Sequence, residues 1–182
     1  YNQAINGKFE GHEYAFYQKA IILGLKGQDT QKLSALNDLI NQYPNSEFVD
    51  DALFQSGIAY QEQNTPTGNQ NALKAYSNLV TKFKGRSKLL PKALNRQALL
   101  YYNMSQLESA IRSYKDVFNY NPDKEDAQDA LNGLEEIYVN DMGKPSEYTA
   151  FVESIPGYKV STNAKDSLAY KAAKAQFDNG NY

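Results

Sequence analysis

The sequence predicts an all-α fold built from stacked repeats of about 40 residues each. Nine-residue segments that begin with alanine recur along the 182-residue chain. They are AFYQKAIIL (15–23), ALFQSGIAY (52–60), ALNRQALLY (93–101), ALNGLEEIY (130–138) and AYKAAKAQF (169–177). Their first alanines are separated by 37, 41, 37 and 39 residues, a steady spacing that one globular core would not need. No strand-like alternation of useful length appears, so the repeats are predicted to be helical.

Each of these segments predicts the first helix of a unit, which we call helix A. The apolar positions lie three and four residues apart, as in Leu53, Gly57 and Tyr60, and therefore share one helical face. A second helix, helix B, follows in three units. These helices are KLSALNDLINQY from Lys32, ALKAYSNLVTKF from Ala72 and SAIRSYKDVFNY from Ser109.

Turn-forming residues separate the predicted helices. The connections are LKGQDT around Gly27, QNTPTGNQ from Gln63, NMSQ from Asn103 and NDMGKPS from Asn140. Each B helix is followed by a residue that stops a helix: Pro44, Gly85 or Pro122.

Gly57 stands inside a predicted helix, although glycine there costs about 1 kcal/mol relative to alanine. We predict that helices A and B cross at this position, where a small residue lets the two backbones approach. Ala20 and Ala98 take the equivalent positions in other units. On the B helices the small residues Ala72 and Ala110 are each followed four residues later by a tyrosine on the same face, Tyr76 and Tyr114.

The amino-acid composition argues against several classes of function. With 41% hydrophobic residues the chain is folded, and no apolar run is long enough for a transmembrane segment. Nineteen basic against 21 acidic residues give a net charge of −2, which argues against nucleic acid as the main partner. There is no cysteine and one histidine, His12, so no metal or cofactor is predicted. We interpret His12 as a solvated residue at a helix start.

The third unit shows the repeat pattern most fully, at Leu94, Ala98, Tyr101, Ala110, Tyr114 and Pro122. This pattern resembles the tetratricopeptide repeat, a helix-turn-helix unit with small and aromatic residues at these places. The resemblance implies a right-handed α-α superhelix of about four units plus a partial fifth. In the fourth unit Glu135 takes the small position, which predicts a splayed or shifted helix pair.

The predicted organisation follows from this register. Residues 1–11 are expected to be the end of a preceding unit or a linker, and residues 161–182 the first helix of a fifth unit. The four units between them are 12–47, 48–88, 89–124 and the degenerate 125–160. The chain is therefore expected to be part of a longer array.

The segment QYPNSEFVDDALFQSGIAYQEQ (42–63) has a narrower likeness. It resembles the repeats of bacterial cell-envelope proteins such as the Tol-Pal coordinator and the outer-membrane-protein assembly lipoproteins, which join units through a tyrosine-proline-x-serine linker. This resemblance implies a periplasmic or outer-membrane-associated location, and leaves the cytoplasm open.

Residue groups that could support catalysis are few, and the sequence predicts that the protein is not an enzyme. Asp50 and Asp51 are adjacent on a helix, so their side chains diverge, and acidic residues near a helix start are favoured by the helix dipole. Glu135 and Glu136 are a similar adjacent pair. The basic run of Lys82, Lys84, Arg86 and Lys88 is interpreted as charge that complements the end of a helix.

The resemblance further implies that A-helix residues line a concave groove that binds a protein or peptide partner. Aromatic anchors and amide side chains suit an extended or helical peptide. The predicted groove residues are Tyr14, Tyr17, Asp51, Phe54, Gln61, Lys92, Asn95, Arg96, Tyr102, Asp129 and Asn132.

Three alternatives stay open. The chain also resembles starch-capture lipoproteins that stack sugars on tyrosines, it could be a passive spacer, and exposed repeat ends could self-associate. The family's clamp for a peptide's C-terminal carboxylate is matched at only two of five places, Lys92 and Arg96, so that ligand is not predicted.

Overall fold

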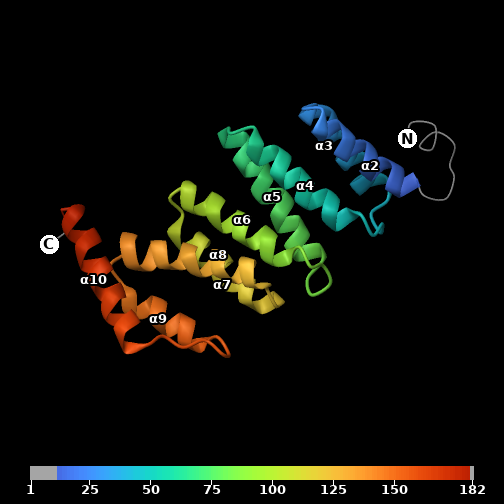
Figure 1. Ribbon diagram of the computed structural model, residues 1–182. Coiled ribbons are helices and arrows are strands. Elements are labelled where there is room, and N and C mark those ends of the chain that lie inside the picture. Colours follow the sequence, from blue (N-terminus) through green and yellow to red (C-terminus); the bar gives the residue numbers. More distant parts are fainter. Residues whose placement is uncertain (1–11, 181–182) are drawn as a thin grey trace. The chain divides into compact units, whose positions relative to one another are not determined.

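A computed structural model describes residues 12–180, and every regular element in that range is helical. The predicted all-α class is therefore confirmed (Figure 1). The chain divides into two compact units, Tyr1–Ala93 and Leu94–Tyr182, which are described separately. The predicted segment 1–11 lies outside the described residues, and the predicted repeat boundaries stay predictions.

The first unit contains two helical hairpins (Figure 1). They are α2 (His12–Leu25) with α3 (Asp29–Gln42), and α4 (Val49–Glu62) with α5 (Pro66–Lys82). Helices α3 and α4 also pack against each other, so the two hairpins stack. Each predicted A and B helix of these two repeats is present.

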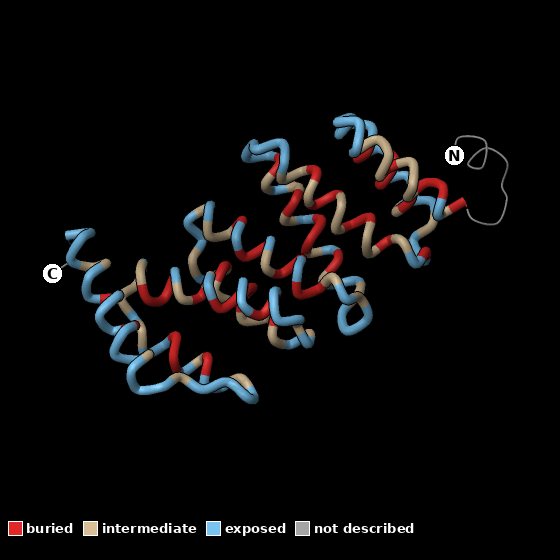
Figure 2. Tube along the Cα trace, viewed as in Figure 1, coloured by how far each residue is buried: buried red, intermediate tan, exposed pale blue. Residues whose placement is uncertain are grey.

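The core of the first unit is built by apolar positions spaced three and four apart. Phe16 and Ala20 of α2 pack with Leu36 and Leu39 of α3 and with Ala52 of α4. Figure 2 shows the buried residues on the sides of the helices that face each other. The turn after α5 is made by Gly85 in the left-handed region at φ 70°, as the predicted helix stop requires.

Gly57 has the close neighbour that its sequence position predicted. A Cβ atom placed on Gly57 would lie 2.3 Å from Cε1 and 2.6 Å from Cζ of Tyr76. Tyr76 is fully buried on α5, four residues after the buried Ala72. The ring of Tyr76 therefore occupies the space that any side chain at Gly57 would need.

Helix α6 (Leu90–Asn103) begins in the first unit and continues into the second. The second unit then contains α7 (Leu107–Asp116), the 3₁₀ turn η1 (Val117–Tyr120), α8 (Lys124–Glu135), the π-helical segment η2 (Glu136–Asp141), α9 (Pro145–Ser154) and α10 (Thr162–Asp178). Asp123 caps α8, because its Oδ1 accepts a hydrogen bond from the backbone N–H of Asp126 at 2.9 Å.

The second unit departs from the regular repeat around Glu135. A Cβ atom on Gly133 would lie 2.2 Å from Cζ of Tyr114, so the tyrosine of α7 lies against Gly133 of α8. Glu135, in the predicted small position, instead forms an ion pair with Lys171 of α10 at 2.8 Å. The helix continues as η2, whose wider turns are marked by the hydrogen bond from Met142 N–H to the Ile137 carbonyl.

Candidate functional site

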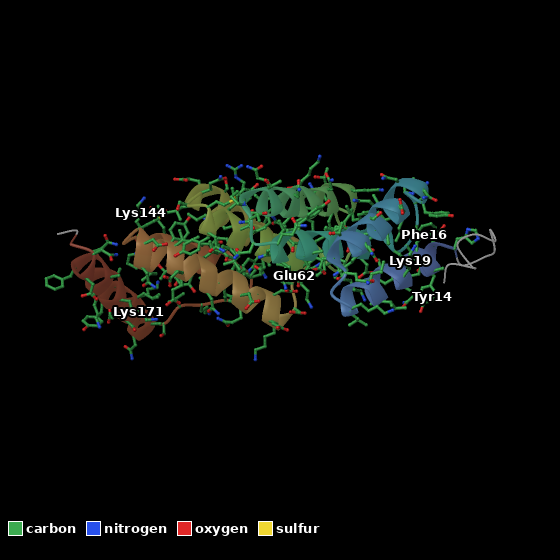
Figure 3. The ribbon with its side chains drawn as sticks, turned by 90° about the horizontal axis from the view of Figure 1, so that it is seen from above. Tyr14, Phe16, Lys19, Glu62, Lys144 and Lys171 are labelled. Carbon is green, nitrogen blue, oxygen red and sulfur yellow. The ribbon has the colours of Figure 1, made fainter. Side chains whose placement is uncertain are left out.

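Three aromatic rings cluster where α2 faces the start of α4. The ring centroids of Tyr14 and Phe48 are 5.5 Å apart, and Tyr17 stacks on Phe48 at 5.5 Å with an angle of 17° between the rings. Tyr14 is 49% exposed, and Tyr17 and Phe48 are half-buried. Figure 3 shows Tyr14 at the surface of α2. We call Tyr14, Tyr17 and Phe48 the aromatic face.

Two of these rings come from predicted groove residues, and the third was missed. Tyr14 and Tyr17 lie three residues apart on α2 and so share one side of the helix. Phe48 belongs to the linker before α4 and was not among the predicted residues. Its place three residues before Asp51, one helical turn away, was the signal that could have identified it.

Two carboxylates adjoin the aromatic face. Asp50 and Asp51 lie in the first turn of α4, where the helix dipole favours negative charge. Asp50 Oδ1 accepts a hydrogen bond from the backbone N–H of Asp51 at 2.9 Å. Partial burial and then the negative charge of Asp50 raise the pKa of Asp51.

The same two charges act on Tyr17. Burial, followed by the charges of Asp51 and Asp50, raises the pKa of the Tyr17 hydroxyl. Tyr17 stacks on Phe48, which lies two residues before Asp50, so α2 and the start of α4 bring the tyrosine near the acidic pair.

Two other predicted groove residues of the first unit, Phe54 and Gln61, make contacts within that unit. The Phe54 ring lies 5.9 Å from the Tyr76 ring, and the Tyr76 hydroxyl donates a hydrogen bond to Gln61 Oε1 at 3.3 Å. Both side chains are therefore held by helix α5. Lys92, at the start of α6, is exposed.

The predicted amide residues of the second unit, Asn95 and Asn132, also form hydrogen bonds within the protein. Asn95 Nδ2 donates to the backbone carbonyl of Asp126 at 2.9 Å, which ties α6 to α8. Its Oδ1 is buried and has no hydrogen-bond partner within residues 12–180. Asn132 Oδ1 accepts from Gln128 Nε2 on the same helix at 2.9 Å. Arg96 and Asp129 are exposed.

Tyr102 has an acidic environment like that of Tyr17, within the second unit alone. Burial, a hydrogen bond to Asp141 and the charges of Asp141 and Glu136 raise its pKa to about 12. Glu136 also accepts a hydrogen bond from Asn140 Nδ2 at 2.7 Å. The π-helical turn η2 supplies both carboxylates, and the repeat pattern gave no sign of it.

His12 differs from its interpretation in the sequence. It is buried, with 8% exposure, and its Nδ1 lies 3.2 Å from the Tyr43 hydroxyl. The expectation of a solvated histidine was wrong because the imidazole packs in a T-shaped arrangement with the Tyr43 ring, which itself contacts Phe16.

Within the basic run, Arg86 bonds to the end of α5, as interpreted, whereas Lys82, in the last turn of α5, reaches the linker before α4. Arg86 donates to the Lys82 carbonyl at 2.6 Å, and Lys82 donates to the Pro44 carbonyl at 2.7 Å. Both cations lie over the Phe83 ring: Lys82 Nζ is 5.7 Å and Arg86 Cζ is 5.6 Å from the ring centroid. These contacts occupy Lys82 and Arg86 without an external anion.

Residues 14–46 match the tetratricopeptide repeat family. The matched segment covers α2 from Tyr14 onward, all of α3 and the turn after it, and it supports a tetratricopeptide repeat protein. Repeats of this family generally mediate interactions between proteins. Tyr14 and Tyr17 lie inside the matched repeat. No curated protein matches the chain.

Two features of residues 12–180 concern other kinds of site. No group of three or more histidine or acidic side chains is arranged to hold a metal ion in that range. None of its helices is long and apolar enough to cross a membrane.

Proposed function

We propose that the protein is a non-catalytic interaction module that binds a segment of a partner protein on the aromatic face. The observation that carries this proposal is the ring cluster of Tyr14, Tyr17 and Phe48, in which Tyr14 stays half exposed. Tyrosine side chains of this kind often dominate binding energy, because they bury a large area with few rotatable bonds.

The predicted amide contacts to a peptide backbone carry less weight in the proposal. Asn95 and Asn132 already take part in hydrogen bonds within the second unit. Affinity is therefore expected to come from the aromatic face, and the other groove residues, Lys92, Arg96, Tyr102 and Asp129, stay predictions.

The tyrosine-proline-x-serine linker at Tyr43–Ser46 supports, as part of the proposal, a periplasmic or outer-membrane-associated location. The net charge of −2 keeps nucleic acid out of the proposed partners. Fractionation of the cells that produce the protein, followed by immunoblotting, tests the location. Recovery in the cytoplasmic fraction alone would contradict it.

A peptide selection tests the function. A random peptide library is displayed and selected on the parent protein, and enriched peptides are measured by fluorescence anisotropy against three proteins. These are the parent, a Tyr14→Ala/Tyr17→Ala double variant and a Tyr158→Ala control. Tyr158 is also an exposed tyrosine, at 38%, but it lies in the second unit beside Phe118.

The proposal expects enriched peptides that bind the parent and the Tyr158→Ala control equally. The double variant should lose at least about tenfold in affinity, because about 1.4 kcal/mol is well within the range of an aromatic hot spot. Equal binding to all three proteins would contradict the proposal. Binding of oligosaccharides instead, lost in the double variant, would establish the carbohydrate alternative.

A further inference from the structure

The helices that carry the aromatic face have an acidic excess. Helix α2 contains one acidic residue, Glu13, and one lysine, Lys19. Helix α4 contains Asp50, Asp51 and Glu62 and neither lysine nor arginine. Figure 3 labels Lys19 and Glu62 together with Tyr14. An approaching partner therefore meets more negative than positive charge on these two helices.

Asp50 and Asp51 have no cationic partner among the described residues, whose ion pairs all lie in the second unit. The dipole of α4 does not offset the cost of burying the Asp51 charge, because partial burial and the charge of Asp50 raise the pKa of Asp51. Half-buried carboxylates in this condition are stabilised by a cation that approaches from outside.

The rings beside these carboxylates suit the same cation. Lysine and arginine bind the faces of aromatic rings within about 6 Å of the centroid. The protein already makes such contacts internally: Lys115 Nζ lies 5.2 Å from the Tyr138 centroid and 4.9 Å from that of Phe151. On the aromatic face, Tyr17 lies near the carboxylates of Asp50 and Asp51, and Tyr14 contacts the same Phe48 ring. No described lysine or arginine lies over the Tyr14 or Tyr17 ring.

We infer that the segment bound on the aromatic face is positively charged, with lysine or arginine side chains that lie along Tyr14 and Tyr17 and reach Asp50 and Asp51. This inference rests on the proposed function and names the chemistry of its partner. A peptide that ends in a free carboxylate or carries acidic side chains is disfavoured, because like charges repel at this surface.

The test uses three end-blocked peptides: acetyl-(Ala-Lys)₄-amide and its glutamine and glutamate counterparts. Fluorescein-labelled peptides are titrated at low ionic strength with the whole chain in four forms. These are the parent, Asp50→Asn/Asp51→Asn, Tyr14→Ala/Tyr17→Ala and the control Asp38→Asn. Asp38 is an exposed acidic residue of α3, on a helix that does not contribute to the aromatic face.

The expected result is that the lysine peptide binds the parent at least about tenfold more tightly than the glutamine peptide, and that the glutamate peptide binds most weakly. Asp50→Asn/Asp51→Asn should remove most of that preference, Asp38→Asn should not, and added salt should weaken the lysine peptide. Equal affinity for the lysine and glutamine peptides would overturn the inference, as would full retention of the preference in Asp50→Asn/Asp51→Asn.

The two proposals fail in different ways. Peptides selected on the parent that lose affinity with Tyr14→Ala/Tyr17→Ala, but show no excess of lysine or arginine, overturn only the charge inference. Peptides whose affinity does not depend on Tyr14 and Tyr17 overturn the proposed function and the inference with it. Circular dichroism of each variant, compared with the parent, shows that a loss of binding is not a loss of folding.

Discussion

Gly57→Ala tests the packing on which the first unit is built. The added methyl carbon would lie 2.3 Å from a ring carbon of Tyr76, far inside van der Waals contact. Tyr76 cannot easily move, because its ring is fully buried, contacts Phe54 and donates a hydrogen bond to Gln61. We therefore expect helices α4 and α5 to separate or the ring to leave its rotamer.

The size of the effect follows from two opposing contributions. Overpacking of a well-packed core costs about 1–3 kcal/mol, and replacing a helical glycine by alanine returns about 1 kcal/mol. A net loss of up to about 2 kcal/mol is expected. For a chain of this length each kcal/mol lowers the melting temperature by roughly 2–4 °C, so the midpoint should fall by up to about 8 °C.

Thermal and urea unfolding, followed by far-ultraviolet circular dichroism, measures this loss. Gly24→Ala is the matched control, because the atoms nearest to its methyl group would belong to the Lys32 side chain, with Cδ at 2.9 Å, and not to an aromatic ring. In a Tyr76→Leu background, Gly57→Ala should cost less, since the opposing ring carbons are gone. A Gly57→Ala protein at least as stable as Gly24→Ala would refute the packing described for α4 and α5.

Three further predictions concern charge and modularity. Asp51→Asn should raise the melting temperature at pH 7 relative to the parent. Because the folded-state pKa of Asp51 is raised, the charged carboxylate lowers the free energy of unfolding above that pKa. The gain in melting temperature should therefore vanish as the pH falls below the ordinary pKa of 3.8. In an ultraviolet absorbance titration, Tyr102→Phe should remove a phenolate step near pH 12, and a parent in which all tyrosines titrate near 10 would contradict this prediction. The raised pKa of Tyr102 also contributes stability below pH 10 that is lost between pH 10 and 12. A fragment ending at Asn121 should unfold cooperatively, since it keeps the whole compact first unit, and an insoluble or molten product would indicate one indivisible core.

Much of the fold could be predicted because the residues that pack within each helical hairpin lie close together in the sequence. Gly57 was conspicuous as a helical glycine, and its period-related alanines showed that the position needs a small residue. The contact with Tyr76 confirms the reasoning. The interpretation of the basic run also holds at Arg86, which donates to the Lys82 carbonyl at the end of α5, because a helix end needs donors for its free carbonyl groups.

The second unit was harder to predict, because its structure depends on contacts distant in sequence. Glu135 signalled an irregular repeat, but its partner Lys171 lies 36 residues away on α10. The π-helical turn follows from no local pattern, and with it the proximity of Asp141 to Tyr102 was missed. Asn95 and Asn132 show a similar limit, since repeat position alone did not show that both amides bond within the protein.

The most direct test of the account is nuclear magnetic resonance mapping of where a selected peptide binds. The ¹⁵N-labelled protein is titrated with the peptide most enriched on the parent, and backbone amide shifts are followed. We predict that the largest changes fall on α2 and the start of α4, around Tyr14, Tyr17, Phe48 and Asp51. Changes confined to other helices, with these amides unmoved at saturation, would contradict the assignment of the aromatic face as the partner site.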